Sequence, residues 1–269
     1  MALHIHFLDP YRPGHSPVHR LDARLKLVLA LAFILSAGLA PDGAWPAYAL
    51  WLSLITSAEA LSELGIAYVL KRAALALPFV LAALPLVFTL DGQPAFNLAI
   101  GPWELAISQP GLERFLSLAF KSWVSVQAAI LLSATTSFPD LLVAMRALRI
   151  PRLLVAIFGL MWRYLFVLAD EALRLVRARV ARSGESGLPG IKSGGRLAWR
   201  ARVAGGMAGS LFLRAFERSD RIYMAMVARG YDGEVRAFPL PGLTGGQWTM
   251  LTAWIGLLAA LLALAHLLW

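Results

Sequence analysis

The chain alternates between long apolar stretches and short polar connections. Six stretches rich in leucine and alanine lie at residues 25–40, 45–61, 73–90, 115–134, 153–169 and 248–269. A helix needs about 20 residues to cross the hydrocarbon core of a bilayer, and most of these stretches approach that length. Strand-like alternation is absent from them, and a bilayer requires backbone polar groups to be paired internally, so we expect helices. The pattern predicts an all-α, polytopic membrane helical bundle.

The basic residues predict which connections face the cytoplasm, because Lys and Arg concentrate on that side. Arg20, Arg24 and Lys26 precede the first stretch, so the N-terminus is expected inside. Few basic residues occur in the turn 41–43 or in the loop 91–114, which we expect outside. The first stretch is not expected to be a cleaved signal, since a long polar segment precedes it.

The fifth stretch, 153–169, is predicted not to cross the bilayer. If it crossed, the basic residues that follow would lie outside, against the charge rule. Arg163 lies at its centre, where a charge costs about 2.5–3.5 kcal/mol on insertion scales. The interpretation is therefore about five spans, with a basic helical insert between the fourth and the last. Pro78 and Pro85 predict kinks in the third span.

Charge is concentrated in that insert. The chain is 59% hydrophobic and 15% charged, with a formal net charge of +9. Residues 139–236 hold 17 of the 25 Lys and Arg but 8 of the 16 Asp and Glu, which accounts for the whole excess. Such a block favours anionic headgroups or an acidic protein partner. Nucleic acid is not expected, because apolar residues interrupt the arginines and no nucleic-acid motif occurs. The absence of cysteine excludes thiolate metal sites and disulfides.

These patterns divide the chain into four parts. Residues 1–24 form a cytoplasmic N-terminal segment, and 25–138 form a membrane domain of four spans. Residues 139–236 form a basic cytoplasmic module, and 237–269 form a linker and the last span. Within the module, a loop rich in glycine at 183–196 is expected to join two long helices.

The two helices of the module are predicted to end alike. The first, from about Pro151, closes with Ala181-Arg182-Ser183 before Gly184, and the second, from about Ala204, closes with Ala228-Arg229-Gly230. Glycine ends a helix at low conformational cost, alanine permits close approach, and arginine offers a planar fork of donors. Ordinary helix C-termini also favour basic residues and glycine. A pair of similar ends on one basic module nevertheless favours docking to a partner.

The sequence resembles the transmembrane T component of energy-coupling factor (ECF) transporters, in particular the cobalt-associated CbiQ branch. The resemblance covers nearly the whole chain. It is carried by Leu21-Asp22-Ala23-Arg24-Leu25-Lys26, by Ile150-Pro151 with Arg163-Tyr164 and Asp170-Glu171, by both helix ends, and by Glu217–Tyr223 with Ala225-Met226 and Gly230-Tyr231-Asp232-Gly233. One departure is Ser183, which stands where the family often has glycine.

The resemblance implies a subunit of the bacterial inner membrane without catalysis or cofactor of its own. Members of this family link two cytoplasmic ABC-type ATPases to a substrate-binding membrane subunit, and each Ala-Arg-Gly-type end sits in a groove of one ATPase. The expected partner-binding residues are therefore Ala181, Arg182, Ser183, Ala228, Arg229 and Gly230. ATP would bind to the ATPases, and cobalt or nickel to the substrate-binding subunit.

Two other classes of protein fit the sequence less well. A membrane-embedded lipid or isoprenoid transferase needs clustered aspartates for Mg²⁺, but Asp140, Asp170 and Asp220 are far apart in the sequence. A secondary carrier predicts inverted repeats, which are not evident. The stretch Gly190-Ile191-Lys192-Ser193 lacks the glycine that a phosphate-binding loop places before Lys-Ser.

Several polar residues could bind a metal or another ion, but each also has a simpler structural explanation. His4, His6, His15 and His19 are possible metal ligands, although the proline-rich segment around them favours a solvated tail. The intramembrane charges Glu59, Glu63 and Lys121 could mark an ion path or support helix packing. We assign no resident metal site.

Overall fold

A computed structural model describes residues 10–89, 94–100, 103–182, 197–233 and 242–269. The chain divides into two compact units. Unit 1 comprises Met1–Leu148 and Leu240–Trp269, and unit 2 comprises Arg149–Pro239. Each unit is helical, which confirms the predicted helical class.

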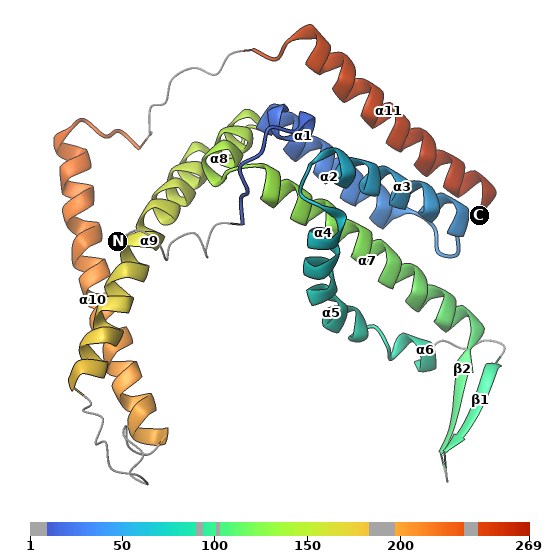
Figure 1. Cartoon of the computed structure of the whole chain (residues 1–269), viewed down its shortest axis with the longest axis horizontal. Helices are drawn as coiled ribbons and strands as arrows, with labels where there is room; N and C mark the ends of the chain where they lie inside the picture. The colour runs from blue at the N-terminus through green and yellow to red at the C-terminus, as the bar shows by residue number, and fades with distance from the viewer. Residues whose placement is uncertain (1–9, 90–93, 101–102, 183–196, 234–241) are drawn as a thin grey trace. The chain divides into compact units, whose positions relative to one another are not determined.

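Unit 1 is built on long helices that pack side by side (Figure 1). They are α2 (Ala23–Leu39), α3 (Trp45–Leu61), α7 (Gln109–Thr135) and α11 (Gly245–Leu268), with the shorter α1 (Pro17–Arg20) and α8 (Phe138–Ala147). Polar side chains start several of them. Asp22 accepts a hydrogen bond from the Arg24 amide at 2.9 Å, and Ser108 accepts one from the Gly111 amide at 3.2 Å. Such N-caps satisfy amides that have no partner within the helix.

Aromatic side chains hold α2, α3 and α7 together. Tyr48 and Trp51 of α3 are almost fully buried. The Tyr48 ring stacks on Phe120 of α7 with 5.3 Å between centroids. The Trp51 indole N–H donates to Ser36 Oγ of α2 at 3.1 Å. These contacts give the bundle a packed interior, with the indole donor satisfied as burial requires.

Two lysines fasten the ends of this bundle. The buried Lys26 Nζ donates to the His19 carbonyl at 3.0 Å and to the Thr135 carbonyl at 2.9 Å, which ties α2 to the end of α7. At the C-terminal end of α2, the Nζ of Lys121, from the middle of α7, donates to the Ala40 carbonyl at 2.6 Å and to Asp42 Oδ1 at 2.7 Å. Free carbonyls at helix ends thereby gain charged donors.

The prediction of one kinked span over 73–90 is wrong. The segment is broken into α4 (Ile66–Ala73), the 3₁₀ turn η2 (Ala74–Ala76), α5 (Leu77–Leu81) and α6 (Leu86–Thr89). Pro78 lies in the first turn of α5, and Pro85 immediately precedes α6. Proline removes a helical donor and disfavours helical geometry in the residue before it. Two prolines in this short stretch therefore break the helix rather than bend it.

A β-hairpin follows, which the sequence analysis did not predict. Strand β1 (Pro94–Ile100) pairs antiparallel with β2 (Trp103–Ser108), with Leu98 opposite Leu105. The helical class still holds, because this hairpin is a local insertion in the connection between α6 and α7 (Figure 1).

Three described helices are long and apolar enough to cross a membrane: α7, α9 (Arg152–Arg182) and α11. Helices α2 and α3 have 17 residues each, about 25 Å at 1.5 Å per residue. The exclusion of residues 153–169 from the bilayer therefore stays a prediction, since α9 meets the criteria of length and composition.

Candidate coupling site

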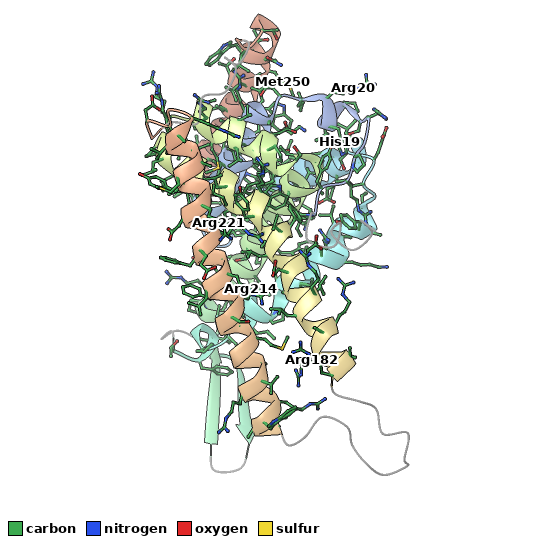
Figure 2. The ribbon with its side chains drawn as sticks, turned by 90° about the vertical axis from the view of Figure 1, so that its left-hand side faces the viewer. His19, Arg20, Arg182, Arg214, Arg221 and Met250 are labelled. Carbon is green, nitrogen blue, oxygen red and sulfur yellow. The ribbon has the colours of Figure 1, made fainter. Side chains whose placement is uncertain are left out.

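Unit 2 consists of two long helices. Helix α9 contains 31 residues, and α10 (Leu197–Ala228) contains 32. Both predicted helices are confirmed, although α10 begins about two turns before Ala204. At 1.5 Å per residue, the two helices are about 46 and about 48 Å long. The helices cross and run in opposite directions, so their C-termini lie at opposite ends of the pair (Figures 1 and 2).

Glu171 joins the two helices. Its carboxylate accepts a hydrogen bond from Arg214 Nη1 of α10 at 2.9 Å and lies 3.5 Å from Arg218 Nη2. Arg174, one turn along α9, lies 3.8 Å away. The Glu171 side chain is 17% exposed, whereas Arg214 is 58% exposed. One acidic side chain thus serves three cations at the crossing, an arrangement that we call the Glu171 clamp.

The same arginines shift the acid–base equilibrium of the clamp. The hydrogen bond from Arg214, assisted by the charges of Arg174 and Arg218, lowers the pKa of Glu171 below its ordinary value. Hydrogen bonds to the charged form of a carboxylate favour that form. Glu171 therefore stays ionised, and the crossing keeps its ion pairs at neutral pH.

The two predicted docking ends lie at the extremities of this pair. The first tip is Ala181–Ser183, and the second tip is Ala228–Gly230. Ala181 and Arg182 form the last turn of α9, and both are exposed. Ser183 lies outside the described residues, as does the stretch 190–193 that was compared with a phosphate-binding loop. Figure 2 shows Arg182 at the end of its helix.

The second tip has a defined helix-terminating geometry. Gly230 adopts φ +79°, its amide donates to the Val227 carbonyl at 2.9 Å, and the Tyr231 amide donates to the Met226 carbonyl at 3.0 Å. This pattern is a glycine C-cap in the left-handed region. Ala228, Arg229 and Gly230 are all exposed. The cap therefore holds Arg229 at an exposed helix end.

Most large apolar side chains of α10 also face away from α9. Phe212, Phe216 and Tyr223 are 68%, 61% and 58% exposed. Their spacing of i, i+4 and i+11 places them on one face of α10, where they form an apolar stripe. A row of exposed aromatic side chains on one helix usually contacts a partner protein or a membrane.

Other candidates from the sequence do not come together. Among the described residues, no group of three or more His, Asp or Glu side chains could hold a metal ion. His19 instead hydrogen-bonds Ser16 Oγ at 2.6 Å and the Arg12 carbonyl at 3.1 Å, while His4 and His6 lie outside the described residues. Lys121 pairs with Asp42 and not with a glutamate.

Glu59 of α3 is fully buried, and neither of its carboxylate oxygens has a hydrogen-bond partner within the described residues. Helix packing and an ion path both remain open for it. Glu63 occupies the turn after α3 with φ +59°. Of the aspartates considered for a transferase, Asp140 belongs to unit 1, and Asp170 and Asp220 belong to unit 2.

The long apolar helices of unit 1 and the long basic helix pair of unit 2 are those of a helical, multi-pass membrane protein. The family model described as cobalt transport protein, CbiQ, matches residues 14–239. The chain therefore belongs to the CbiQ/EcfT family, the transmembrane components of ECF transporters. It is a multi-pass protein of the bacterial inner membrane.

Individual relatives agree with this assignment. The energy-coupling factor transporter transmembrane protein EcfT of Exiguobacterium sibiricum is 31% identical over 267 residues, which cover 95% of each chain. The cobalt transport protein CbiQ of Salmonella typhimurium is 29% identical over 167 residues, 60% of this chain and 70% of that protein. The CbiQ of Rhodobacter capsulatus is 30% identical over 155 residues, 58% of this chain and 60% of the relative.

Proposed function

We propose that this chain is the coupling subunit of an ECF-type importer for cobalt or nickel. It joins two ABC-type ATPases, which bind the ATP, to a metal-specific membrane subunit, which binds the ion. The observation that carries the proposal is the pair of similar, exposed tips, each with an alanine followed by an arginine at the end of a long helix.

The spacing of the tips supports two separate ATPase contacts. Arg182 lies 11 residues beyond Glu171, and Arg229 lies 15 residues beyond Arg214. At 1.5 Å per residue these segments are about 16 and 22 Å long. Because they extend to opposite ends of the pair, the tips are on the order of 30 Å apart. One small groove cannot receive both, whereas one groove on each of two subunits can.

The chemistry of each tip suits a groove lined by acidic side chains or carbonyl groups. A guanidinium binds a carboxylate with two parallel hydrogen bonds, and the adjacent alanine keeps the helix end narrow. The Glu171 clamp then transmits movement, since the ion pairs at the crossing restrain α9 and α10 to move together. The apolar stripe of α10 is the proposed contact for the metal-binding subunit.

The proposed division of the chain follows from these roles. Residues 25–138 and the last span anchor the subunit in the bilayer, and residues 139–236 form the cytoplasmic coupling module. The excess of Lys and Arg in this module supports its cytoplasmic position.

The proposal is tested by reversing the charge of the tips. We expect the double variant Arg182→Glu/Arg229→Glu to insert normally, to lose co-purification of the ATPases and to lose metal uptake. Each single variant should retain part of the ATPase, because one tip remains intact. A glutamate at the tip repels an acidic groove and removes the donors that the arginine supplies.

The matched control is Arg177→Glu/Arg221→Glu. Both residues are exposed arginines on the same two helices, so the net charge changes equally while the tips remain intact. We expect this control to retain the ATPases. Equal loss from both double variants would show that bulk charge governs assembly, and normal ATPase capture by the tip variant would contradict the assigned roles.

A further inference from the structure

A second feature of the protein, separate from the coupling site, is an apolar cavity in unit 1. Its volume is about 460 Å³, and α1, α2, α3, α7 and α11 line it. Most lining side chains are aliphatic or aromatic, among them Phe33, Leu54, Ile55, Met250 and Trp254. The volume lies within the range of about 300–1,000 Å³ typical of sites for small ligands.

One charged side chain lines this cavity among the described residues. Lys26 is 8% exposed, and two of its three N–H donors bind the His19 and Thr135 carbonyls. An ammonium has three donors, so one remains for a ligand. Arg20 lies in the same short helix as the lining residues Pro17 and Val18, and it is exposed. It forms no ion pair with the described residues. The cavity is thus apolar, with the Lys26 ammonium in its wall and the exposed Arg20 on the short helix that supplies Pro17 and Val18.

The cationic end corresponds to the cytoplasmic face of the predicted topology. Lys26 and Arg20 belong to the basic group that precedes the first span. Figure 2 shows His19, Arg20 and Met250 near the same end of unit 1. A cavity at this depth is level with the inner leaflet, whose anionic headgroups carry the opposite charge.

We propose that this cavity binds one anionic phospholipid of the inner leaflet. One acyl chain enters between α2, α3 and α11, and the phosphate approaches Lys26 and Arg20. Water is a poor occupant, because the walls offer few polar partners. An uncharged apolar ligand is disfavoured for a different reason: it gains little on leaving the bilayer, which is equally apolar. Selection therefore depends on the charge of the headgroup.

The test is native mass spectrometry of the purified, delipidated full chain. It is titrated with phosphatidylglycerol and with phosphatidylcholine that carry the same acyl chains. Each basic residue near the headgroup strengthens binding of an anionic lipid severalfold. We therefore expect one tightly bound phosphatidylglycerol, with an affinity about tenfold above that of phosphatidylcholine. No ATPase is present, so this result does not depend on the proposed coupling function.

Variants separate the cavity from the general lipid surface. Met250→Trp places a larger, rigid side chain in the cavity wall and should weaken binding of the tightly bound lipid. Ala259→Trp adds the same ring to an exposed position of α11 that does not line the cavity, and it should bind lipid like the wild type. Lys26→Met should reduce the preference for phosphatidylglycerol to about twofold.

If the Lys26→Met variant does not fold, Arg20→Gln provides a second test, because the Arg20 side chain is exposed and makes no described contact with another helix. It should lower the preference for phosphatidylglycerol without changing thermal stability. Equal affinity of the wild type for both lipids would overturn the proposal. So would equal lipid occupancy in the Met250→Trp and Ala259→Trp variants.

Discussion

Gly230 allows the proposed docking role of the second tip to be separated from its role in ending a helix. Its φ of +79° lies in the left-handed region, and a Cβ built at this position meets no other heavy atom within 4 Å. The change Gly230→Ala therefore has no steric cost within the protein. Its cost is conformational, about 1 kcal/mol, because a side chain disfavours left-handed geometry. This corresponds to roughly a fivefold weaker helix cap.

Gly230→Asn is the informative comparison. Asparagine adopts the left-handed conformation more readily than alanine, so it should preserve the cap better. However, its side chain is larger. If an ATPase backbone approaches this tip closely, asparagine obstructs the contact more than alanine does. We therefore expect the helix cap to weaken in the order wild type, Asn, Ala, and ATPase capture to weaken in the order wild type, Ala, Asn.

Hydrogen exchange of the amides at 229–231 measures the cap, and quantitative co-purification measures capture. The control is Gly65→Ala at the start of α4 in unit 1, where φ is +81° and the surroundings are equally open. It carries the same conformational cost and should leave capture unchanged. If capture followed the order of cap stability, with Asn better than Ala, close approach to Gly230 would be refuted.

Two further predictions concern ion pairs. Lys121→Met should lower the free energy of unfolding by about 2 kcal/mol, since the Ala40 carbonyl and Asp42 both lose a charged donor. Asp42→Asn alone should lower the free energy of unfolding by less than about 1 kcal/mol, because Asp42 is 41% exposed. Additive losses in the double variant, measured by reversible unfolding in detergent, would contradict a shared interaction. The lowered pKa of Glu171 means that its stabilisation of the helix pair is complete above the ordinary glutamate pKa of about 4.3 and is lost as pH falls through the lowered value. The distance between α9 and α10 can be followed by energy transfer between two fluorescent labels, one on each helix. We expect the contact to persist at pH 5 and to weaken in stronger acid, and we expect Glu171→Gln to remove this pH dependence. An unchanged acid transition in that variant would assign the transition to another group.

The long helices could be predicted from the sequence because each is a nearly continuous apolar or amphipathic run. The broken segment over 73–90 could not, since an apolar run of this length has the composition of a span whether or not it is continuous. Pro78 and Pro85 were visible, but proline bends some membrane helices and breaks others, depending on whether neighbouring groups satisfy the freed backbone. Tertiary packing decides between these outcomes.

The sequence of the hairpin alternates between apolar and polar residues, a pattern that differs from that of the membrane spans. From Phe96 to Ile107 apolar residues alternate with smaller or polar ones, as in Phe96-Asn97-Leu98 and Trp103-Glu104-Leu105. Alternation of this kind is typical of strands. A short segment with period two is easily missed beside helical stretches of twice its length.

The two tips of the candidate site could be predicted from the sequence, but the ion pairs that join their helices could not. Arginine after alanine near a glycine is a local pattern, and it located both tips. In the sequence, Glu171 stands out only as part of the Asp170-Glu171 pair that contributes to the family resemblance. Its partners Arg214 and Arg218 lie more than 40 residues away. No local spacing rule pairs residues at such a separation, because the crossing of α9 and α10 brings them together.

The position of the clamp explains why a few side chains can control a large module. Among the described contacts, Glu171 supplies the ion pairs between α9 and α10, while most apolar side chains of α10 remain exposed. A helix pair with little buried apolar surface gains little rigidity from packing. The described ion pairs between α9 and α10 meet at this one point, and each tip is more than 15 Å from it by helix length. A small rotation at Glu171 becomes a larger displacement at Arg182 and Arg229, as a coupling role between distant subunits requires.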